Sequence, residues 1–172
     1  MSLLLPDADT TVAAGRRLAD LLGAGDLVVL TGGLGAGKTT LTRGLGEGLG
    51  VRGAVTSPTF VIARVHPSLV GGGPELVHVD AYRLGGSAEL DDLDLDSELD
   101  EAVTVVEWGA GLAEGLADER LEITLVADPA TEARTLTATG VGARWAGVDV
   151  ESHLQEAVGA TTRTSADEGG VP

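Results

Sequence analysis

An eight-residue glycine-rich segment constrains the fold of this chain more than any other feature. Residues 32–39 read Gly-Gly-Leu-Gly-Ala-Gly-Lys-Thr and satisfy the pattern G-x-x-x-x-G-K-[ST] at each fixed position. The apolar run Leu27–Leu30 before it is typical of a buried parallel strand. After it, Leu41, Leu45 and Leu49 recur at the four-residue spacing of a helix that faces a sheet. This order of strand, loop and helix predicts an α/β fold.

The residue types of this segment suit the binding of a nucleoside triphosphate together with Mg²⁺. Glycines allow backbone conformations in which successive N–H groups turn toward phosphate oxygens, and the following helix directs its positive end at the same anion. Lys38 is expected to reach the β- and γ-phosphates, and the Thr39 hydroxyl to ligate Mg²⁺. A chance glycine loop in a glycine-rich chain is the alternative. The expected nucleotide contacts in this segment are Gly33, Leu34, Gly35, Ala36, Gly37, Lys38, Thr39 and Thr40.

The remaining patterns predict a single domain over residues 1–158. The expected helices are Thr10–Leu22, one or two within the acidic stretch Ser87–Glu101, Leu112–Leu116 and Val150–Val158. The expected strands are Thr59–Val65, Glu75–Asp80, Val103–Val106, Leu121–Val126 and Ala133–Thr139. The last two strands flank Asp128-Pro129 and read as a C-terminal antiparallel pair. The predicted fold is therefore P-loop NTPase-like, with a central, mostly parallel sheet flanked by helices. Residues 159–172 are small and polar, which predicts disorder.

Two acidic residues end apolar strands, where ligands gather in open α/β sheets. Asp80 follows Leu76–Val79, and Glu107 follows Val103–Val106. Either carboxylate could orient magnesium or water, or could simply be a solvated acid at a strand end. His78 should point to the face opposite Val77 and Val79, and we expect it to serve in packing. Trp108 could pack on the ligand or a partner, or fill a core or hinge position.

Charge and composition narrow the class of protein further. Eleven basic and 27 acidic side chains leave a formal net charge of −16, which would repel nucleic-acid phosphates. The chain alone is therefore not expected to bind nucleic acid. The absence of cysteine excludes disulfides, thiolate metal sites and a cysteine nucleophile. No secretory signal or run of about 18 apolar residues is visible, so we expect a cytoplasmic protein without membrane association.

Four motifs in this order and spacing are similar to those of one bacterial family. They are Gly32–Thr40, Ser57–Phe60, the His-Val-Asp-Ala-Tyr-Arg-Leu segment His78–Leu84, and Val106–Trp108. The set resembles the TsaE (YjeE) family, the ATPases of tRNA threonylcarbamoyladenosine biosynthesis. The resemblance extends over Leu5–Trp145, and it departs at Gly109, where the family often has proline.

The resemblance implies an ATPase that acts through a protein complex. In that family the partner is a heterodimer of two related proteins, which transfers a threonylcarbamoyl group to adenosine 37 of tRNA. ATP and Mg²⁺ are the implied cofactors, and tRNA is reached only through the partner. The resemblance also makes Lys38 a nucleotide residue, Glu107 a magnesium-shell residue and Asp80 a residue of hydrolysis. Ser57–Phe60 would be a switch-like loop, and Thr11, with Thr10, would lie by the adenine.

The expected reaction is in-line attack of water on the γ-phosphate, with Lys38 and Asp80 as the catalytic residues and Thr39 and Glu107 at the metal. Arg43 and Arg83 are candidate arginine fingers, but we expect each rather to form a salt bridge. We therefore expect slow hydrolysis by the chain alone and faster hydrolysis with the partner. Two alternatives stay open: a nucleotide-dependent binding switch with incidental hydrolysis, and a small-molecule kinase.

Overall fold

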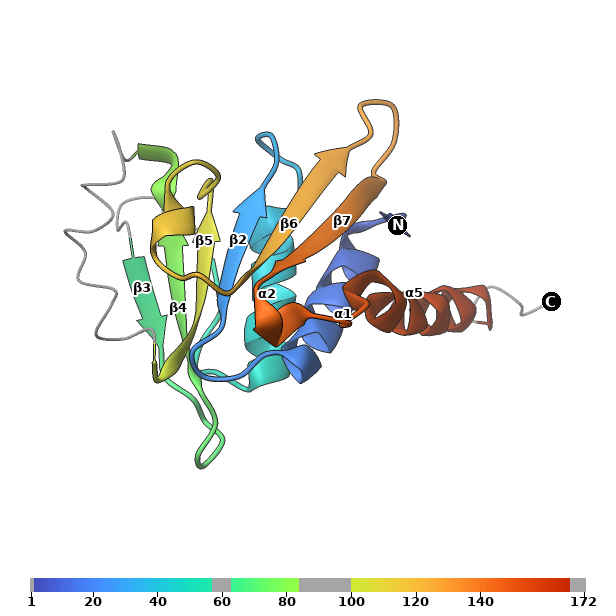
Figure 1. Cartoon of the computed structure of the whole chain (residues 1–172). Coiled ribbons are helices and arrows are strands. Elements are labelled where there is room, and N and C mark those ends of the chain that lie inside the picture. The colour runs from blue at the N-terminus through green and yellow to red at the C-terminus, as the bar shows by residue number, and fades with distance from the viewer. Residues whose placement is uncertain (1, 57–62, 84–99, 168–172) are drawn as a thin grey trace.

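The computed structural model describes residues 2–56, 63–83 and 100–167, which form a seven-stranded sheet with helices packed against it (Figure 1). The strands are β1 (Leu3–Leu5), β2 (Leu27–Thr31), β3 (Ala63–His66), β4 (Glu75–Asp80), β5 (Ala102–Glu107), β6 (Arg120–Ala127) and β7 (Arg134–Val141). The helices are α1 (Ala8–Leu18), α2 (Lys38–Leu49) and α5 (Val150–Asp167). Short 3₁₀ turns are η1 (Ala19–Leu21), η2 (Ala81–Arg83), η3 (Ala113–Gly115) and η4 (Ala143–Trp145).

The sheet has a parallel centre and antiparallel edges. Its order is β1-β7-β6-β2-β5-β4-β3, in which β6, β2, β5 and β4 run parallel. At one edge β3 pairs antiparallel with β4, and at the other β7 pairs antiparallel with both β6 and β1. The predicted α/β class and the C-terminal antiparallel pair are confirmed. Strand β1 was not expected, because three residues carry no measurable periodicity, yet Leu3 and Leu5 are fully buried.

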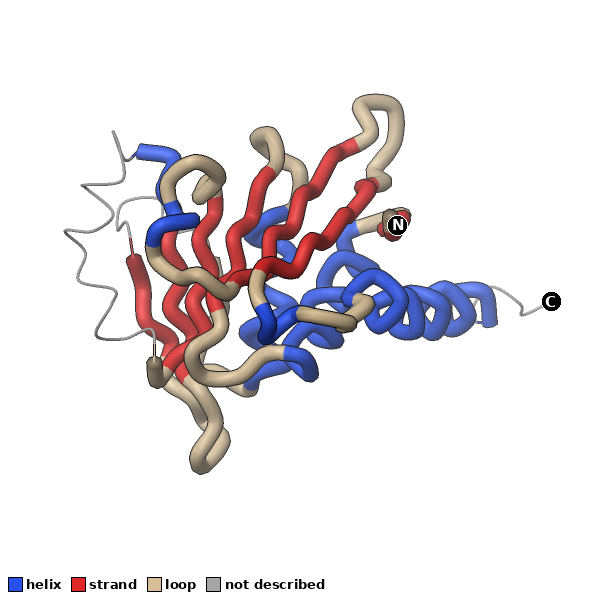
Figure 2. Tube along the Cα trace, in the orientation of Figure 1, coloured by secondary structure: helices blue, strands red, loops and turns tan. Residues whose placement is uncertain are grey.

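The three α-helices gather on one face of the sheet (Figures 1 and 2). The main core lies between the helices and the sheet. It is formed by alternate side chains of the central strands, such as Val28 and Leu30, together with Leu41 and Leu45 of α2. A smaller core on the opposite face joins Val29, Val77 and Val79 with residues around η3. None of the helices that the structure describes is long and apolar enough to cross a membrane.

Helices α1 and α2 pack so closely that their backbones touch. A Cβ atom added to Gly15 would lie 2.2 Å from the Leu41 carbonyl oxygen, and one added to Gly44 would lie 2.1 Å from the Val12 carbonyl oxygen. Glycines that weaken α2 by helix propensity are thus the residues that let α1 approach it. This contact brings the N-terminal turns of both helices to the same end of the sheet.

Several predicted boundaries differ from the structure. Strand β3 begins at Ala63, and residues 59–62 of the predicted strand lie outside the described residues. The predicted loop Ser57–Phe60 and residues 87–99 of the predicted acidic helices also lie outside them. The predicted helix end at Val158 is wrong, because α5 continues to Asp167. No proline interrupts this stretch, so each further residue adds one helical hydrogen bond. The domain boundary at residue 158 stays a prediction.

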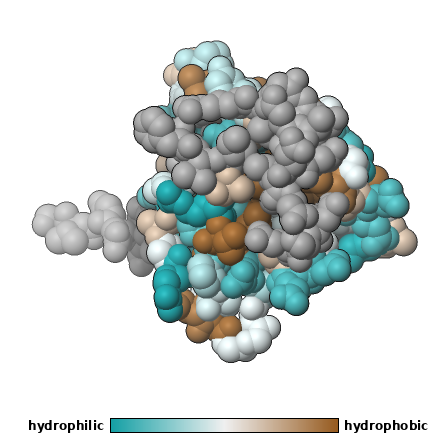
Figure 3. Space-filling model, turned by 90° about the vertical axis from the view of Figure 1, so that its left-hand side faces the viewer, coloured by the Kyte–Doolittle hydropathy of each residue, from teal (hydrophilic) through white to brown (hydrophobic). Residues whose placement is uncertain are grey.

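The β3 edge of the sheet exposes apolar side chains. Val65 on β3, and Leu69 and Val70 in the loop that follows, are each at least 40% exposed. Figure 3 looks onto this side of the molecule, where hydrophobic groups lie among hydrophilic ones.

Candidate nucleotide-binding site

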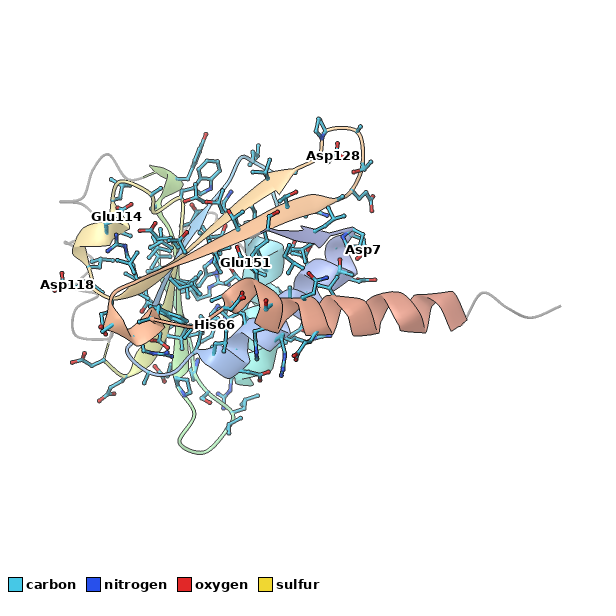
Figure 4. All side chains as sticks on the ribbon, turned by 45° about the vertical axis from the view of Figure 1, so that its right-hand side comes forward. Asp7, His66, Glu114, Asp118, Asp128 and Glu151 are labelled. Carbon is cyan, nitrogen blue, oxygen red and sulfur yellow. The ribbon has the colours of Figure 1, made fainter. Side chains whose placement is uncertain are left out.

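A cavity of about 380 Å³ opens where the parallel strands end. The loop between β2 and α2 forms its floor, Asp80 ends β4, and Trp108 follows β5. Because β7 runs antiparallel, its first residue, Arg134, reaches the same end of the sheet. The β2–α2 loop and the β6–β7 turn, which carries Asp128, stand at this end in Figures 1 and 4. The lining residues are Leu34, Gly35, Ala36, Gly37, Lys38, Thr39, Thr40, Asp80, Tyr82, Trp108 and Arg134.

The backbone of the loop has the shape that its glycines predict. Gly35 and Gly37 have φ angles of 76° and 101°, in the left-handed region that side chains disfavour. Gly37 caps α2, which begins at Lys38, so the N-terminal turn of α2 borders the cavity. Unpaired N–H groups and the helix dipole make such a turn a site for phosphate. Leu34, at the tip of the loop, is 95% exposed.

Lys38 is buried and holds its own loop in place. Its Nζ donates to the carbonyl oxygens of Gly32 and Gly33 at 2.8 and 2.9 Å, and lies 3.8 Å from the centre of the Trp108 ring. Burial lowers the pKa of the Lys38 amine, and the carboxylates of Glu107 and Asp80 oppose that shift. An amine that donates to carbonyl oxygens of the glycine loop can exchange those acceptors for phosphate oxygens.

The two predicted carboxylates lie side by side. Asp80 and Glu107 are partners in the β4–β5 register, and the Asp80 carboxylate accepts from the Tyr82 backbone N–H at 3.0 Å. Glu107 is only 2% exposed, which excludes the solvated strand-end acid for this residue. Its Oε2 accepts from the Thr39 hydroxyl at 3.0 Å, so the metal residues predicted from sequence are in contact.

The residues at this contact fit a magnesium ion. Mg²⁺ prefers hard oxygen ligands and is usually held by one or two carboxylates together with the phosphates of its nucleotide. Thr39 and Glu107 supply a hydroxyl and a carboxylate beside the phosphate loop. Within residues 2–56, 63–83 and 100–167, no cluster of three or more His, Cys, Asp or Glu side chains forms a complete metal cage. The arrangement therefore suits an ion that arrives with a nucleotide.

His78 contacts the site, which the sequence did not indicate. It lies on the face opposite Val77 and Val79, as predicted, because those valines belong to the smaller core. Its Nε2 is 2.8 Å from Oε1 of Glu107. Alternation along one strand fixes the face of a side chain but not its partner on the next strand, so packing was the simpler expectation.

Trp108 adopts a backbone conformation that is uncommon for its residue type. Its φ is 62°, a left-handed value that costs about 1–2 kcal/mol for a residue with a Cβ atom. Its backbone N–H donates to the Leu30 carbonyl at 2.9 Å, which ties the turn after β5 to the end of β2. The ring centre lies 5.0 Å from that of Tyr82. These contacts place the indole on the cavity wall, where it covers the Lys38 amine.

Arg134 is a site residue that the sequence did not reveal. Its Nε lies 3.0 Å from where a Cβ on Gly37 would be, and that nitrogen is buried without a hydrogen-bond partner among the described residues. The guanidinium also donates to the Glu132 carbonyl. Of the predicted arginine fingers, Arg43 is exposed and does not line the cavity, and the Arg83 side chain lies outside the described part. Only the register of the β6–β7 hairpin brings Arg134 to the loop.

Thr11 lies close to the loop but does not line the cavity. Its side chain is buried, and its hydroxyl donates to the Asp7 carbonyl at 2.8 Å in the first turn of α1. Its methyl group lies 3.8 Å from the Cβ position of Gly37. Asp7 and Thr10 form a capping box that fixes this turn. The adenine contact predicted for Thr11 therefore stays a prediction.

The mostly parallel sheet, the glycine loop after its central strand and the strand-end acids define a P-loop NTPase-type α/β protein. Residues 5–136 match the family described as Threonylcarbamoyl adenosine biosynthesis protein TsaE, and the chain belongs to this family.

Similar proteins and structures agree with this assignment. A tRNA threonylcarbamoyladenosine biosynthesis protein TsaE from Streptomyces coelicolor is 69% identical over 140 residues, which cover 79% of this chain and 94% of that protein. The protein of the same name from Mycobacterium tuberculosis is 52% identical over 127 residues, covering 70% and 76%. The crystal structure of YdiB from Bacillus subtilis superposes with a TM-score of 0.67 at 30% identity, covering 94% of this chain and 95% of that one.

Proposed function

We propose that this chain binds ATP with Mg²⁺ and hydrolyses it in the machinery that makes N6-threonylcarbamoyladenosine at position 37 of tRNA. The observation that carries the proposal is the placement of Lys38 and Thr39 at the base of a cavity that Asp80 also lines, with Glu107 on the Thr39 hydroxyl. The names of the relatives support the role in tRNA modification.

Nucleotide binding would replace contacts that the loop makes with itself. Lys38 would leave the carbonyls of Gly32 and Gly33 for the phosphates, and the N-terminal turn of α2 would supply backbone N–H donors. Thr39 and Glu107 would hold Mg²⁺, which neutralises charge on the phosphate oxygens when bound. Arg134 would bind the nucleotide from the β7 side, because β7 and β4 lie on opposite sides of β2.

Hydrolysis would depend on Asp80 and Lys38. Asp80 reaches the cavity from β4, where its carboxylate can orient a water molecule for attack on the γ-phosphate. Lys38 would stabilise the negative charge that develops on the phosphate oxygens. Arg134 lies on the side of β2 opposite Asp80, so it would not reach the phosphate that the water attacks. An arginine that stabilises the charge on that phosphate would therefore come from the partner. The chain alone would therefore hydrolyse ATP slowly.

The partner in this proposal is a heterodimeric threonylcarbamoyl-transfer complex of two related protein subunits in the cytoplasm. The chain would contact tRNA only through that complex, since its net charge of −16 opposes direct contact with phosphates.

Two variants test the assignment of roles. Lys38→Ala should abolish ATP binding, whereas Asp80→Ala should bind ATP within a few-fold of wild type and lose hydrolysis by about a hundredfold or more. Binding is measured with a fluorescent ATP analogue, and hydrolysis by phosphate release with and without the purified partner complex. Loss of ATP binding in Asp80→Ala would show that Asp80 is structural or a metal ligand. Fast turnover unaffected by the partner would contradict the proposed activation.

The alternative of a binding switch is separated from hydrolysis by one assay. If a non-hydrolysable ATP analogue supports repeated cycles of tRNA modification by the reconstituted machinery, hydrolysis is incidental and the chain is a switch. If modification stops after one turnover, hydrolysis resets the machinery, as proposed.

A further inference from the structure

We propose that His78 is a positioning residue that holds the Glu107 carboxylate in the orientation needed for magnesium. This inference rests on the proposed metal role of Glu107. His78 is fully buried on β4, and its Nε2 lies 2.8 Å from Oε1 of Glu107 at the end of β5. In the register, His78 pairs with Val105 and Asp80 pairs with Glu107. The imidazole therefore reaches diagonally across two neighbouring strands to the carboxylate.

The two oxygens of Glu107 have different partners. Oε2 faces the phosphate loop and accepts from the Thr39 hydroxyl at 3.0 Å. Oε1 faces away from the loop, toward His78 Nε2 at 2.8 Å and the Thr42 hydroxyl at 3.4 Å. If the Thr39 hydroxyl bound a metal ion instead, Oε2 would lose that donor, whereas Oε1 would keep its contact with the imidazole. The carboxylate would then keep its orientation, with Oε2 directed at the metal.

A packing role alone does not explain a histidine at this position. A buried polar ring costs free energy unless it forms hydrogen bonds. His78 Nδ1 has no hydrogen-bond partner within residues 2–56, 63–83 and 100–167. A leucine or phenylalanine would fill the space without leaving that nitrogen unpaired. The bond to Glu107 is what a histidine supplies here, and a carboxylate oxygen can only accept, so Nε2 is the nitrogen that carries hydrogen.

Partners that orient a metal ligand typically change metal affinity by about 10–100-fold when removed. We therefore expect His78→Leu to weaken the dependence of nucleotide binding on magnesium by about tenfold or more. The quantity measured is the dissociation constant of a fluorescent ADP analogue in EDTA divided by that in saturating MgCl₂, which we call the magnesium ratio. The dissociation constant in EDTA should change little, because His78 does not line the cavity. His78→Gln can donate an amide N–H to the same oxygen and should keep most of the ratio.

His66 offers a matched control. It is also a buried histidine of this sheet, with Nδ1 3.4 Å from the Arg52 carbonyl. It pairs with Leu76 near the start of β4 and lies away from the end that carries the Asp128 turn (Figure 4). His66→Leu should leave the magnesium ratio unchanged, even if it lowers the melting temperature.

Glu107→Gln distinguishes a failure of the proposed metal role of Glu107 from a failure of the positioning role of His78. If Glu107→Gln keeps the full magnesium ratio, the metal role of Glu107 is wrong and the proposed function fails at that point. If Glu107→Gln loses the ratio but His78→Leu keeps it, the metal site stands and the positioning role of His78 is wrong. Equal losses of ratio and of thermal stability in His78→Gln and His78→Leu would make His78 a packing residue.

A measurement on the wild-type protein covers the case in which His78→Leu does not fold. Nitrogen-15 NMR of the imidazoles should show His78 with hydrogen on Nε2, protected from exchange, both without ligand and after addition of MgCl₂ and ADP. A His78 ring with hydrogen on Nδ1 alone, or loss of the Nε2 hydrogen bond on addition of magnesium, would overturn the inference.

Discussion

Lys38 is the single lysine of the chain, so the N-terminal amine is the only other group that reductive methylation labels. After reductive methylation with a carbon-13 label, the NMR signal of Lys38 should titrate at a lower pH than in the same methylated protein unfolded in urea. The reason is burial, which lowers the pKa of the Lys38 amine more than Glu107 and Asp80 raise it. Addition of MgCl₂ and ADP should raise that pKa, because phosphate charge favours the ammonium form. A native pKa at or above the unfolded value would contradict the burial seen here.

The same shift sets the direction of a pH dependence. Between the lowered native pKa of Lys38 and its ordinary value of 10.5, the unfolded chain binds more protons than the folded chain. The contribution of Lys38 to stability therefore rises with pH across this window. We expect the free energy of unfolding of wild type to increase relative to that of Lys38→Met as the pH rises toward 10.5, as measured by urea titration. A difference that is constant with pH would contradict the shift.

Arg134 should govern affinity for the nucleotide and leave turnover unchanged. Its guanidinium reaches the cavity from β7, on the side of β2 opposite Asp80. Hydrogen bonds to charged groups contribute about 1.5–3 kcal/mol, so Arg134→Gln should weaken ATP binding by about 10–100-fold while kcat stays within a few-fold. Arg120→Gln removes a guanidinium from the far end of the same hairpin and serves as the control. A fall in kcat with unchanged affinity would instead place Arg134 at the reacting phosphate.

At the scale of elements, the contact between α1 and α2 depends on glycine. Gly44→Ala adds a helix former, which alone would stabilise α2 by about 1 kcal/mol. The new Cβ would lie 2.1 Å from the Val12 carbonyl oxygen, a backbone atom that cannot rotate away. Overpacking costs about 1–3 kcal/mol, and a clash with a fixed backbone atom should reach the upper end of this range, so we expect a net loss of stability of up to about 2 kcal/mol. The measurement is the urea midpoint at constant m-value.

Gly115→Ala is the control for this prediction. Gly115 also lies in a helical turn, but nothing is within 4 Å of its Cβ position. Its substitution should change stability by no more than about 0.5 kcal/mol. If Gly44→Ala is as stable as wild type, the two helices can separate without cost, and their close approach is not a constraint of the fold.

The sequence predicted those elements that are marked by the hydrophobic periodicity or turn residues of their own segment. The β2 run, the glycine loop and the leucine stripe of α2 each carry their own periodicity, and the β6–β7 hairpin is marked by Asp128-Pro129. Contacts between His78 and Glu107, and between Arg134 and Gly37, depend instead on which residues of different strands lie side by side. Register of this kind is set by the whole sheet, so sequence periodicity alone could not supply it.

At the scale of the whole molecule, the distribution of charge favours binding of ATP and disfavours binding of tRNA. The cavity gathers Lys38 and Arg134 at one end of the sheet, while the chain as a whole carries a net charge of −16. Two cations suffice for a bound triphosphate, which also brings Mg²⁺. They do not form the clustered basic surface that a folded RNA requires.

We therefore expect the chain alone to show no specific binding of tRNA at physiological salt. The assay is fluorescence anisotropy with labelled tRNA between 50 and 200 mM salt, performed with the chain alone, the partner complex alone and both together. Binding should follow the partner complex, and the chain with MgATP should change the affinity or turnover of that complex only. Because each neutralised phosphate steepens the salt dependence, direct binding would appear as affinity that falls with salt for the chain alone. Such a dependence, lost in Arg134→Gln or Lys38→Ala, would show that the cavity itself receives RNA phosphates and would overturn indirect access.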